Sequence, residues 1–430
     1  MRADRRDLFR GAGALGVSAA LGACASTRAV PALAGAPRTD WRRGFDNQRI
    51  SDLGDGRFLN PVLSGDRPDP AVLKDGEDYY CTFSTFDSYP GLLIWHSRDL
   101  VNWQPRKAAL QRNIGSVWAP SLHKDKGHYL LYIPVKAQPN DIFVAHAEHI
   151  DGPWEHHPGN PLVRTTSVDE AWWSRGHASL VEGPDGSWWS LYHGYENGFW
   201  TLGRQCLLDP VTFTADSWFH MTGGDLSRPI AKPRGGEALP HGMPLSDDFS
   251  RPIELGSKWS FFRPAPDEAS RVRVADGALH LAGKGEAPST GSPLLLTAGD
   301  RSYMFECDIE IAPGGRAGLI LFYDDKLYAG LGFDEERFVT HQYGIERARP
   351  ANPHGGRMRM RVTNRAHIVT FDTSGDGGRT WRRFDRGMEV SGYHHNVRGG
   401  FLMLRPGLYA AGPGEARFRD FRFSALEDPR

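Results

Sequence analysis

The sequence predicts an all-β protein, with a β-propeller in its first half and a β-sandwich in its second. Three observations support this fold class. The chain of 430 residues contains 50 glycines and 30 prolines, which is typical of many short strands joined by tight turns. Short segments of alternating apolar and polar residues recur along the chain, and no segment shows convincing helical periodicity. The first half also repeats itself at a spacing typical of propeller blades.

Residues 1–34 are expected to be an export signal and not part of the fold. Arg5 and Arg6 resemble a twin-arginine signal, and the small apolar run after them is too short and too glycine-rich to span a membrane comfortably. The motif that ends at Cys24 resembles a lipobox, so Cys24 is a candidate for acylation; cleavage after Ala34 is the alternative. We therefore expect a periplasmic or cell-surface protein, attached to a membrane only through a lipid anchor on Cys24.

Residues 35–50 are expected to be a spacer, and residues 51–229 a propeller domain made of repeated units. Each unit has a hairpin turn at a glycine and closes at a tryptophan. The glycines lie 51 and 59 residues apart and the tryptophans 51 and 64 residues apart: Gly76, Gly127 and Gly186; Trp103, Trp154 and Trp218. A period of about 50 residues is the span of a blade, so we predict three four-stranded blades. A plain β-sandwich with coincidental spacing is the alternative.

Residues 230–245 contain glycines and prolines without periodicity and are expected to be a linker. Residues 246–427 are predicted to form a separate domain. Its apolar and polar residues mix or alternate in short segments, at 259–263, 278–281, 303–311, 317–323 and 416–423. Short strands at this spacing are typical of an antiparallel sandwich or jelly roll.

The charge balance argues against a nucleic-acid or anionic membrane partner. Lys and Arg number 51 against 52 Asp and Glu, a formal net charge of -1, which is compatible with a neutral substrate. The four cysteines are far apart and show no metal-binding spacing, so neither a zinc site nor a disulfide framework is expected.

The segment Asn60–Pro70 places one carboxylate, Asp69, between two prolines at the start of a predicted strand. Proline fixes its own φ and restricts the residue before it, so Arg67 and Asp69 are expected to be extended and firmly held. A firmly held carboxylate suits acid–base catalysis. The alternative is that Asp-Pro only opens a turn before the strand.

Several short motifs stand out along the chain, most of them in the first unit. They are Asn60–Leu63, Arg67–Pro70, Asp78–Tyr80, Ser84–Gly91, His96–Trp103, Trp118–Pro120, Gly176–Ser179 and Leu202–Arg204 in the first domain, and Asp248–Ser250, Trp259 and Ala317–Leu319 in the second. Together these motifs resemble glycoside hydrolase family 43, the β-xylosidase and α-L-arabinofuranosidase group, and the C-terminal half is similar to the concanavalin-like sandwich that many of these xylosidases have.

The resemblance implies a glycosidase that inverts the sugar's configuration and acts on xylo- or arabino-oligosaccharides of plant polysaccharide. One carboxylate then activates water while an acid protonates the leaving oxygen. The motif match gives Asp69 the role of general base. His177 corresponds to a histidine that often helps to hold calcium or water on the propeller axis, so calcium is a candidate structural ion; a buried structural histidine is the alternative.

The resemblance also suggests residues that bind the sugar. Arg204 would reach the sugar pocket, or else pair with a surface acid. Phe86, Tyr89 and Trp118 could form its walls by stacking on the sugar, although each could equally belong to the core. Asp248 and Asp420, at the two ends of the sandwich sequence, are a weaker candidate for a calcium site.

The sequence departs from the family at one important place. The family propeller has five blades, and the three units found here correspond to its first, second and last, so the propeller is expected to be shortened. The two missing blades are those that carry the family's general acid. Glu170 is the main candidate to replace it, with the neighbouring Asp169 as another and Glu196 a weaker one. The alternative function is therefore a catalytically impaired surface protein that only binds carbohydrate; a dimer whose chains complement each other's missing blades is a third possibility.

Overall fold

In the computed structural model the described residues are 41–125, 128–132, 145–146, 155–156, 162–215 and 219–428. The chain divides into a unit of residues 1–39 and a unit of residues 40–430, and the second is described below. The expected export signal, the acylation candidate Cys24, and Gly127, Trp154 and Trp218 of the repeats lie outside the described residues. Within the described part, no helix is long and apolar enough to cross a bilayer.

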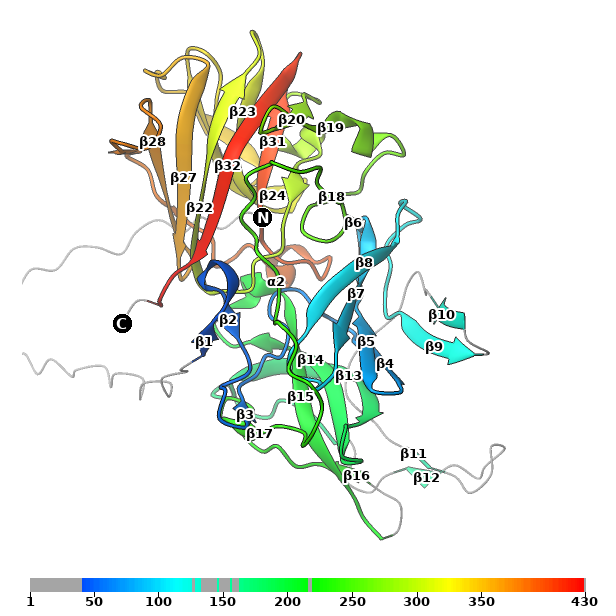
Figure 1. Ribbon diagram of the computed structural model, residues 1–430. Helices are drawn as coiled ribbons and strands as arrows, with labels where there is room; N and C mark the ends of the chain where they lie inside the picture. The colour runs from blue at the N-terminus through cyan, green and yellow to red at the C-terminus, as the bar shows by residue number, and fades with distance from the viewer. Residues whose placement is uncertain are drawn as a thin grey trace, which may run out of the picture. The chain divides into compact units, whose positions relative to one another are not determined.

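Two four-stranded antiparallel sheets form most of the first domain, and they coincide with the first and third predicted units (Figure 1). In both sheets the strands pair in chain order, as in a propeller blade. The first consists of β4 (Ala71–Asp75), β5 (Asp78–Thr82), β7 (Gly91–Ser97) and β8 (Gln104–Leu110). The other consists of β13 (Trp172–Glu182), β14 (Trp188–Glu196), β15 (Arg204–Phe213) and β16 (Phe219–Met221).

The middle unit is described only in two short pairs, so the number of blades stays a prediction. Its strands are β9 (Ser121–Asp125) with β10 (His128–Tyr132), and β11 (Ala145–His146) with β12 (Glu155–His156). Near the start of the described chain, β1 (Arg42–Arg43) pairs with β2 (Arg49–Ile50), and β3 (Arg57–Phe58) pairs with β17 (Ile230–Ala231).

The two complete sheets meet along their first strands. Ser179 on β13 donates a hydrogen bond of 2.7 Å to the carbonyl of Pro70, immediately before β4. The Tyr79 hydroxyl donates to the carbonyl of Glu182 at 3.1 Å. The sheets also share one apolar core, to which each contributes buried side chains such as Trp95 and Leu191. The turn that carries Asp69 therefore lies at the junction of the two sheets.

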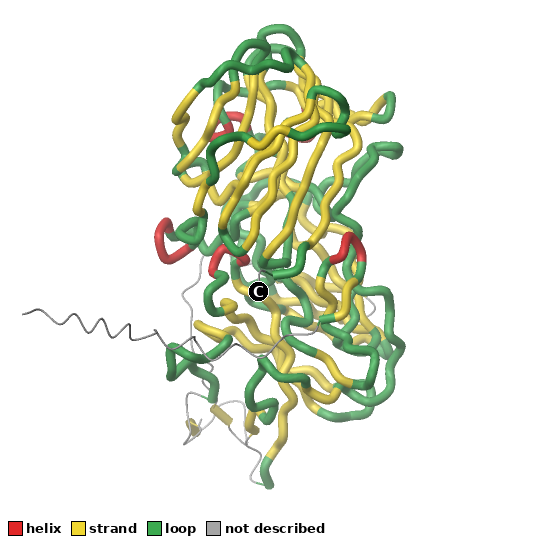
Figure 2. The backbone as a smooth tube through the Cα atoms, turned by 90° about the vertical axis from the view of Figure 1, so that its left-hand side faces the viewer, coloured by secondary structure: helices red, strands yellow, loops and turns green. Residues whose placement is uncertain are grey.

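The second domain consists of two eight-stranded antiparallel sheets around a large apolar core (Figure 2). The alternating segments named above all become strands, because one side of each packs into this core. In spatial order one sheet contains β26 (Ile345–Ala348), β25 (Phe338–Gln342), β24 (Leu327–Phe333), β23 (Arg316–Asp324), β31 (Arg405–Ala411), β21 (Leu294–Leu295), β18 (Ser260–Phe262) and β6 (Ser88–Tyr89). The other contains β19 (Val272–Ala275), β20 (Ala278–Ala282), β32 (Glu415–Ala425), β22 (Ser302–Ile311), β27 (Arg357–Arg365), β28 (Ile368–Ser374) and β29 (Arg382–Arg383), with β30 (Met388–Glu389) also paired to β28.

The described helices are short and lie between strands. They are η1 (Phe45–Asn47), η2 (Trp200–Leu202), η3 (Glu268–Arg271), α1 (Pro288–Gly291) and α2 (His395–Arg398). The all-β prediction is thus confirmed, as is the sandwich in the second half. Cys81, Cys206 and Cys307 are free and buried.

Two expected boundaries differ from the structure. Residues 41–50, expected as part of a spacer, form β1, η1 and β2, and Arg49 is buried with its guanidinium on Glu196 at 2.9 Å. Strand β6, expected inside the propeller domain, pairs with β18 and so extends a sandwich sheet. Both corrections have one cause: the contacts join residues far apart in the chain, which a local pattern does not reveal.

Candidate active site

Asp69 lies in the turn two residues before β4. The sequence predicts an extended backbone here, and the structure does not have one. The φ of Asp69 is 54°, in the left-handed region that non-glycine residues rarely adopt. This conformation brings the backbone N of Asp69 within 3.1 Å of Nδ1 of His193 and its carboxylate within 2.5 Å of the Ser84 hydroxyl. The prolines on either side hold the turn, but partners on other strands determine its conformation.

Three side chains surround the carboxylate of Asp69, which is only 7% exposed. The Ser84 hydroxyl donates to Oδ2 at 2.5 Å. Nδ1 of His193 lies 3.1 Å from Oδ1, and Nη1 of Arg204 lies 3.4 Å from the same oxygen. Burial raises the pKa of Asp69, but the hydrogen bonds from His193 and Ser84 and the charge of Arg204 outweigh it and hold the pKa well below its ordinary value. Asp69 is therefore an ionised carboxylate.

His193 on β14 holds this arrangement in place as a neutral ring. Burial, and then the charge of Arg204, lower its pKa to about 4. Nε2 lies 3.4 Å from Nη1 of Arg204, which can only donate, so Nε2 must accept and the proton sits on Nδ1. Nδ1 then donates to Oδ1 of Asp69, 3.1 Å away.

Arg204 is the first residue of β15, and aromatic rings lie against it. Its guanidinium carbon is 5.4 Å from the ring centre of Phe86 and 4.7 Å from that of Phe401, which belongs to the second domain. Cation–π contacts of this kind partly offset the cost of a buried charge. The side chain is 4% exposed, so in this structure its contacts are with Asp69, His193 and the rings.

His177 lies on the solvent side of Asp69. Its Nδ1 is 3.9 Å from Oδ1, and its side chain is 44% exposed, so it is not a buried core histidine. The pairing of β13 with β14 shifts register on either side of Gly176, and His177 itself has a φ of 54°. Such an irregularity changes the direction of side chains on a strand and is frequent near active sites.

The three predicted aromatic residues differ in access. Tyr89 is fully buried in a small core with Leu92 and Val117, and its hydroxyl donates to the carbonyl of Gly115. A sugar cannot reach it, so its predicted role as a pocket wall is wrong: strand β6 turns its ring inward. Phe86 is only 1% exposed.

Trp118 is the aromatic candidate that is partly exposed. It meets Phe86 edge to face at 5.2 Å between ring centres, and Phe401 edge to face at 5.4 Å. His395 stacks on the other face of this group, 3.7 Å from Phe401. The second domain thus contributes Phe401 and His395 to the surroundings of Asp69.

Several residues around Asp69 share its unusual backbone. Phe86 and Ala119 have φ values of 46° and 43°, beside 54° at both Asp69 and His177. Non-glycine residues in this region are strained by about 1–3 kcal/mol each, and such strain clusters at functional sites. Similar φ values also occur elsewhere, for example at Leu92 and Phe249, so strain supports the site only together with the contacts of Asp69.

Glu170, the candidate acid, is held in a loop before β13. Its carboxylate accepts from the backbone N–H groups of Thr166 and Ser167 at 2.7 and 3.1 Å and pairs with Arg175 at 2.6 Å. Burial raises its pKa, but these partners outweigh it and lower the pKa. A general acid must keep its proton near neutral pH, so this environment disfavours the role.

The carboxylate of Glu196 is also held by ion pairs and a hydrogen bond. It pairs with Arg49 at 2.9 Å and with Nε of Arg301 at 2.7 Å, and it accepts from Gln205 at 2.8 Å. Burial raises its pKa, but the two arginines dominate and lower it to about 2. Glu196 therefore joins the N-terminal segment to the second domain.

Calcium is a candidate structural ion from the sequence analysis. Among the described residues no group of three or more His, Cys, Asp or Glu side chains is arranged to hold a metal ion. Asp248 accepts from Ser250 in a tight turn, and Asp420 pairs with Arg359 at 3.0 Å. A calcium site near His177 stays a prediction.

Ser84 and His193, which hold Asp69, were not among the sequence candidates. His193 had one usable signal: it is a polar residue in a strand of otherwise largely apolar and aromatic residues, and such residues usually have a specific partner. Phe401 and His395 offered no signal, because they approach the site from a separate domain.

Comparison with known proteins agrees with this geometry. The model of glycosyl hydrolases family 43 matches residues 58–155 and 137–219, and the model of the beta xylosidase C-terminal concanavalin A-like domain matches residues 246–424. A non-reducing end alpha-L-arabinofuranosidase of Bacteroides ovatus is 23% identical over 496 aligned positions, which cover 85% of this chain and 93% of the relative. A beta-xylosidase of Bacillus subtilis is 38% identical over 127 residues, 27% of this chain and 21% of the relative.

Solved structures show the same fold. A GH43 protein of Bacillus licheniformis superimposes with a TM-score of 0.73 at 20% identity, covering 86% of this chain and all of the other. A xylan beta-1,4-xylosidase of Bacillus halodurans also gives 0.73 at 20% identity, covering 85% of this chain and 99% of the other. With a family domain at residues 58–219 and the associated C-terminal domain at 246–424, the chain belongs to glycosyl hydrolases family 43.

Proposed function

We propose that this chain hydrolyses the glycosidic bonds of xylosides or arabinosides with inversion of configuration, and that Asp69 is the general base. The observation that carries the proposal is the carboxylate itself. It is ionised and held by three side chains from separate segments of the chain, and exposed His177 lies on its open side. A carboxylate fixed in this way can orient a water molecule and accept its proton as the water attacks the sugar.

The side chains that contact Asp69 have different roles. Ser84 and Arg204 keep the carboxylate ionised, and neutral His193 fixes the position of Oδ1. A low pKa makes a carboxylate a weaker base, but it also keeps the carboxylate ready at every pH above about 4. His177 is placed to hydrogen-bond the incoming water or a sugar hydroxyl.

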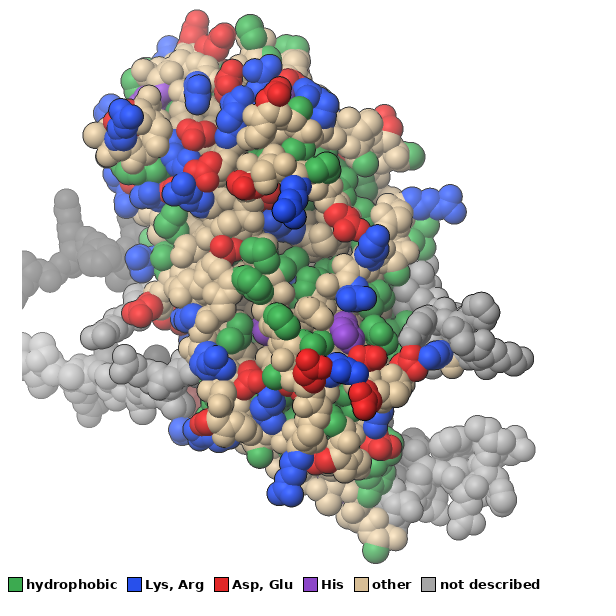
Figure 3. All heavy atoms as spheres, viewed as in Figure 1, with side chains coloured by type: hydrophobic (Ala, Val, Ile, Leu, Met, Phe, Trp, Pro, Cys, Tyr) green, Lys and Arg blue, Asp and Glu red, His purple; other side chains and the backbone are tan. Residues whose placement is uncertain are grey.

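The proposed substrate class rests on the relatives and on charge. The relatives are described as an alpha-L-arabinofuranosidase and a beta-xylosidase, whose substrates by these names are pentosides. Pentosides are neutral, and Figure 3 shows acidic and basic side chains mixed over the visible face of the molecule. No single-sign field is present there that would select a charged substrate.

A second candidate function is carbohydrate binding with little or no turnover. Among the candidate acids, Glu170 and Glu196 are ion-paired and have lowered pKa values. The family model matches in two segments, and the alignment to the arabinofuranosidase runs over 496 positions although this chain has 430 residues. Part of that relative therefore has no counterpart here. Without an acid the rate falls by roughly two to four orders of magnitude.

Turnover of nitrophenyl β-xyloside and nitrophenyl α-L-arabinofuranoside separates the two candidates. We expect Asp69→Asn to lower the rate by about 10² to 10⁴, while the isosteric amide preserves the local packing. NMR of the first-formed sugar with a natural xylo-oligosaccharide then reports the stereochemistry. A wild-type rate no greater than that of Asp69→Asn would remove the hydrolase proposal, and calorimetry with xylo-oligosaccharides would then test binding alone.

A further inference from the structure

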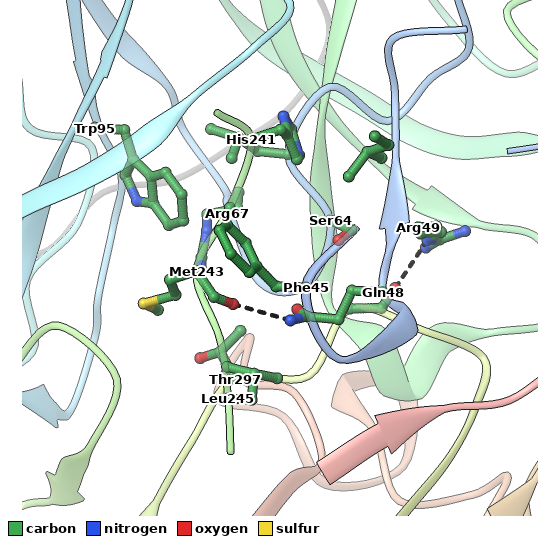
Figure 4. A pocket seen from close by; sticks show the side chains of 14 residues that line it. Phe45, Gln48, Arg49, Ser64, Arg67, Trp95, His241, Met243, Leu245 and Thr297 are labelled. Carbon is green, nitrogen blue, oxygen red and sulfur yellow. Dashed lines mark hydrogen bonds between the residues drawn. The ribbon is translucent and has the colours of Figure 1, made fainter. Parts of the chain in front are cut away.

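A polar cavity lies between the first sheet and the second domain, next to the proposed catalytic site, because Ser84 also lines it. It has a volume of about 80 Å³. Its lining includes Asp66, Arg67 and Thr85 from the first domain and Arg405 from the second. A smaller cavity of about 40 Å³ shares Arg67, which Figure 4 shows among residues of the N-terminal segment, the first sheet and the linker.

Hydrogen-bond donors around the larger cavity lack acceptors. Nη2 of Arg405, Nε of Arg67 and Oγ1 of Thr85 are buried and have no hydrogen-bond partner among the described residues. Arg405 is 3% exposed as a residue, and its Nη1 donates to Ser88 at 2.7 Å. Most buried polar groups have a partner, so three unpaired groups around one cavity indicate a missing acceptor.

The charges around the cavity do not balance. Among the lining residues, Arg67 and Arg405 face one carboxyl group, Asp66; Asp87 also attracts Arg405, but it is paired with Arg263 at 2.9 Å. Lys258 also lines the cavity, but it pairs with Asp247 at 2.9 Å and donates to the carbonyl of Ser246. The two guanidinium groups thus leave at least one positive charge without a counterion in a site largely removed from water, which is costly.

Protonation of Asp66 increases this imbalance. Burial raises the pKa of Asp66 to about 7, despite the charges of Arg204, Arg67 and Arg405. Burial also lowers the pKa of Arg67 and of Arg405, in each case to about 10, so both stay cationic near neutral pH. Close to pH 7 a large fraction of the molecules therefore has two cations and no anion around the cavity.

We propose that this cavity binds one small monovalent anion, such as chloride or a short carboxylate, with Arg405 and Thr85 as donors and Arg67 as a second positive charge. A single water needs roughly 10–15 Å³, so the volume accommodates such an anion with water beside it. The chemistry does not suit a neutral sugar, which would leave both guanidinium groups unbalanced. This site goes beyond the proposed hydrolysis and does not depend on it.

Bromide provides a direct test with the full chain. Crystals soaked in sodium bromide and measured at the bromine absorption edge should show one anomalous peak next to Nη2 of Arg405 inside the cavity. Peaks confined to the exposed surface, with only water in the cavity, would overturn the proposal. This result is read from diffraction, so it is independent of whether the chain hydrolyses a glycoside.

Chloride binding in solution supplies a second test. The ³⁵Cl NMR line of dilute chloride should broaden on adding the protein, and acetate should reverse the broadening. Arg405→Gln should weaken this binding at least tenfold. The matched control is Arg228→Gln, because Arg228 is exposed and pairs with Asp225 at 3.5 Å outside the cavity lining. Equal broadening in both variants would contradict the assignment, and the bromide peak remains decisive if Arg405→Gln does not fold.

Discussion

Asp69 and Asp66 lie three residues apart, in two regions that treat a buried carboxyl group in opposite ways. Asp69 receives hydrogen bonds at both oxygens, from Ser84 and His193, and its pKa is lowered. Asp66 accepts one backbone N–H, from Arg204 at 3.2 Å, and burial raises its pKa to about 7 although three arginines are near. Hydrogen bonds aimed at the carboxylate thus decide its charge more than nearby positive charge does.

The comparison also shows why Asp66 does not serve as the general acid. Asp66 has a pKa that suits a general acid, but its carboxyl lines the interface cavity, and the open side of Asp69 is the one where His177 lies. Its Oδ1 also lies where a Cβ on Gly203 would be 2.4 Å away, so glycine is needed there for close packing. A suitable pKa without access to the substrate does not make a catalytic acid.

Arg204→Met should give the largest change, because it removes the cation that compensates Asp69. Met preserves much of the apolar contact with Phe86 and Phe401. The hydrogen bond from the backbone N–H of residue 204 to Asp66 is unaffected. Leaving Asp69 buried and unpaired should cost about 3–5 kcal/mol in the free energy of unfolding, measured in urea. The double variant Asp69→Asn/Arg204→Met should recover part of this loss, and purely additive losses would show that the pair is not coupled.

Ser84→Ala tests the importance of directed hydrogen bonds. It removes the donor to Oδ2 of Asp69 and the acceptor for the N–H of Ala119, so it should cost about 1–3 kcal/mol. The pKa of Asp69, followed by ¹³C NMR of the carboxyl carbon, should rise towards its ordinary value. Ser190→Ala is the matched control: Ser190 is fully buried, and its hydroxyl has no partner among the described residues. Equal losses for the two variants would contradict the proposed role of Ser84.

Asp66→Asn should change how stability depends on pH. In the folded wild-type chain Asp66 stays protonated up to about pH 7, whereas in the unfolded chain it ionises above about pH 4. The wild-type chain therefore loses stability as pH rises through this window, and the variant does not. Relative to wild type, the variant should gain about 2–4 kcal/mol between pH 4 and pH 8, measured by urea unfolding. A constant difference across this range would show that the pKa of Asp66 is not raised.

The fold followed from local patterns wherever one side of a strand meets the core. The hairpin glycines Gly76 and Gly186 lie at turns between β4 and β5 and between β13 and β14, and alternation located the sandwich strands. Alternation did not reveal partners that lie far away in the chain. It therefore missed the pairing of β6 with β18 and the burial of Arg49 against Glu196.

The site could be predicted only in part, for a related reason. Motifs identified Asp69, His177 and Arg204, and the structure brings these three together. Motifs could not tell which side of a strand an aromatic ring occupies, so they assigned Tyr89 to the pocket although it is fully buried. Phe401 follows Asp69 by 332 residues, and only the packing of two domains makes them neighbours of Arg204.

His177→Gln should have the smallest effect on stability and thereby separate folding from function. The side chain is 44% exposed and makes one long contact with Asp69, so the free energy of unfolding should change by less than about 0.5 kcal/mol. Under the proposed hydrolysis, the loss of a hydrogen bond to water or sugar should lower kcat/KM for nitrophenyl β-xyloside by about tenfold or more. An unchanged kcat/KM would place the substrate away from His177 and leave the face of Asp69 towards Trp118 as the approach to be tested.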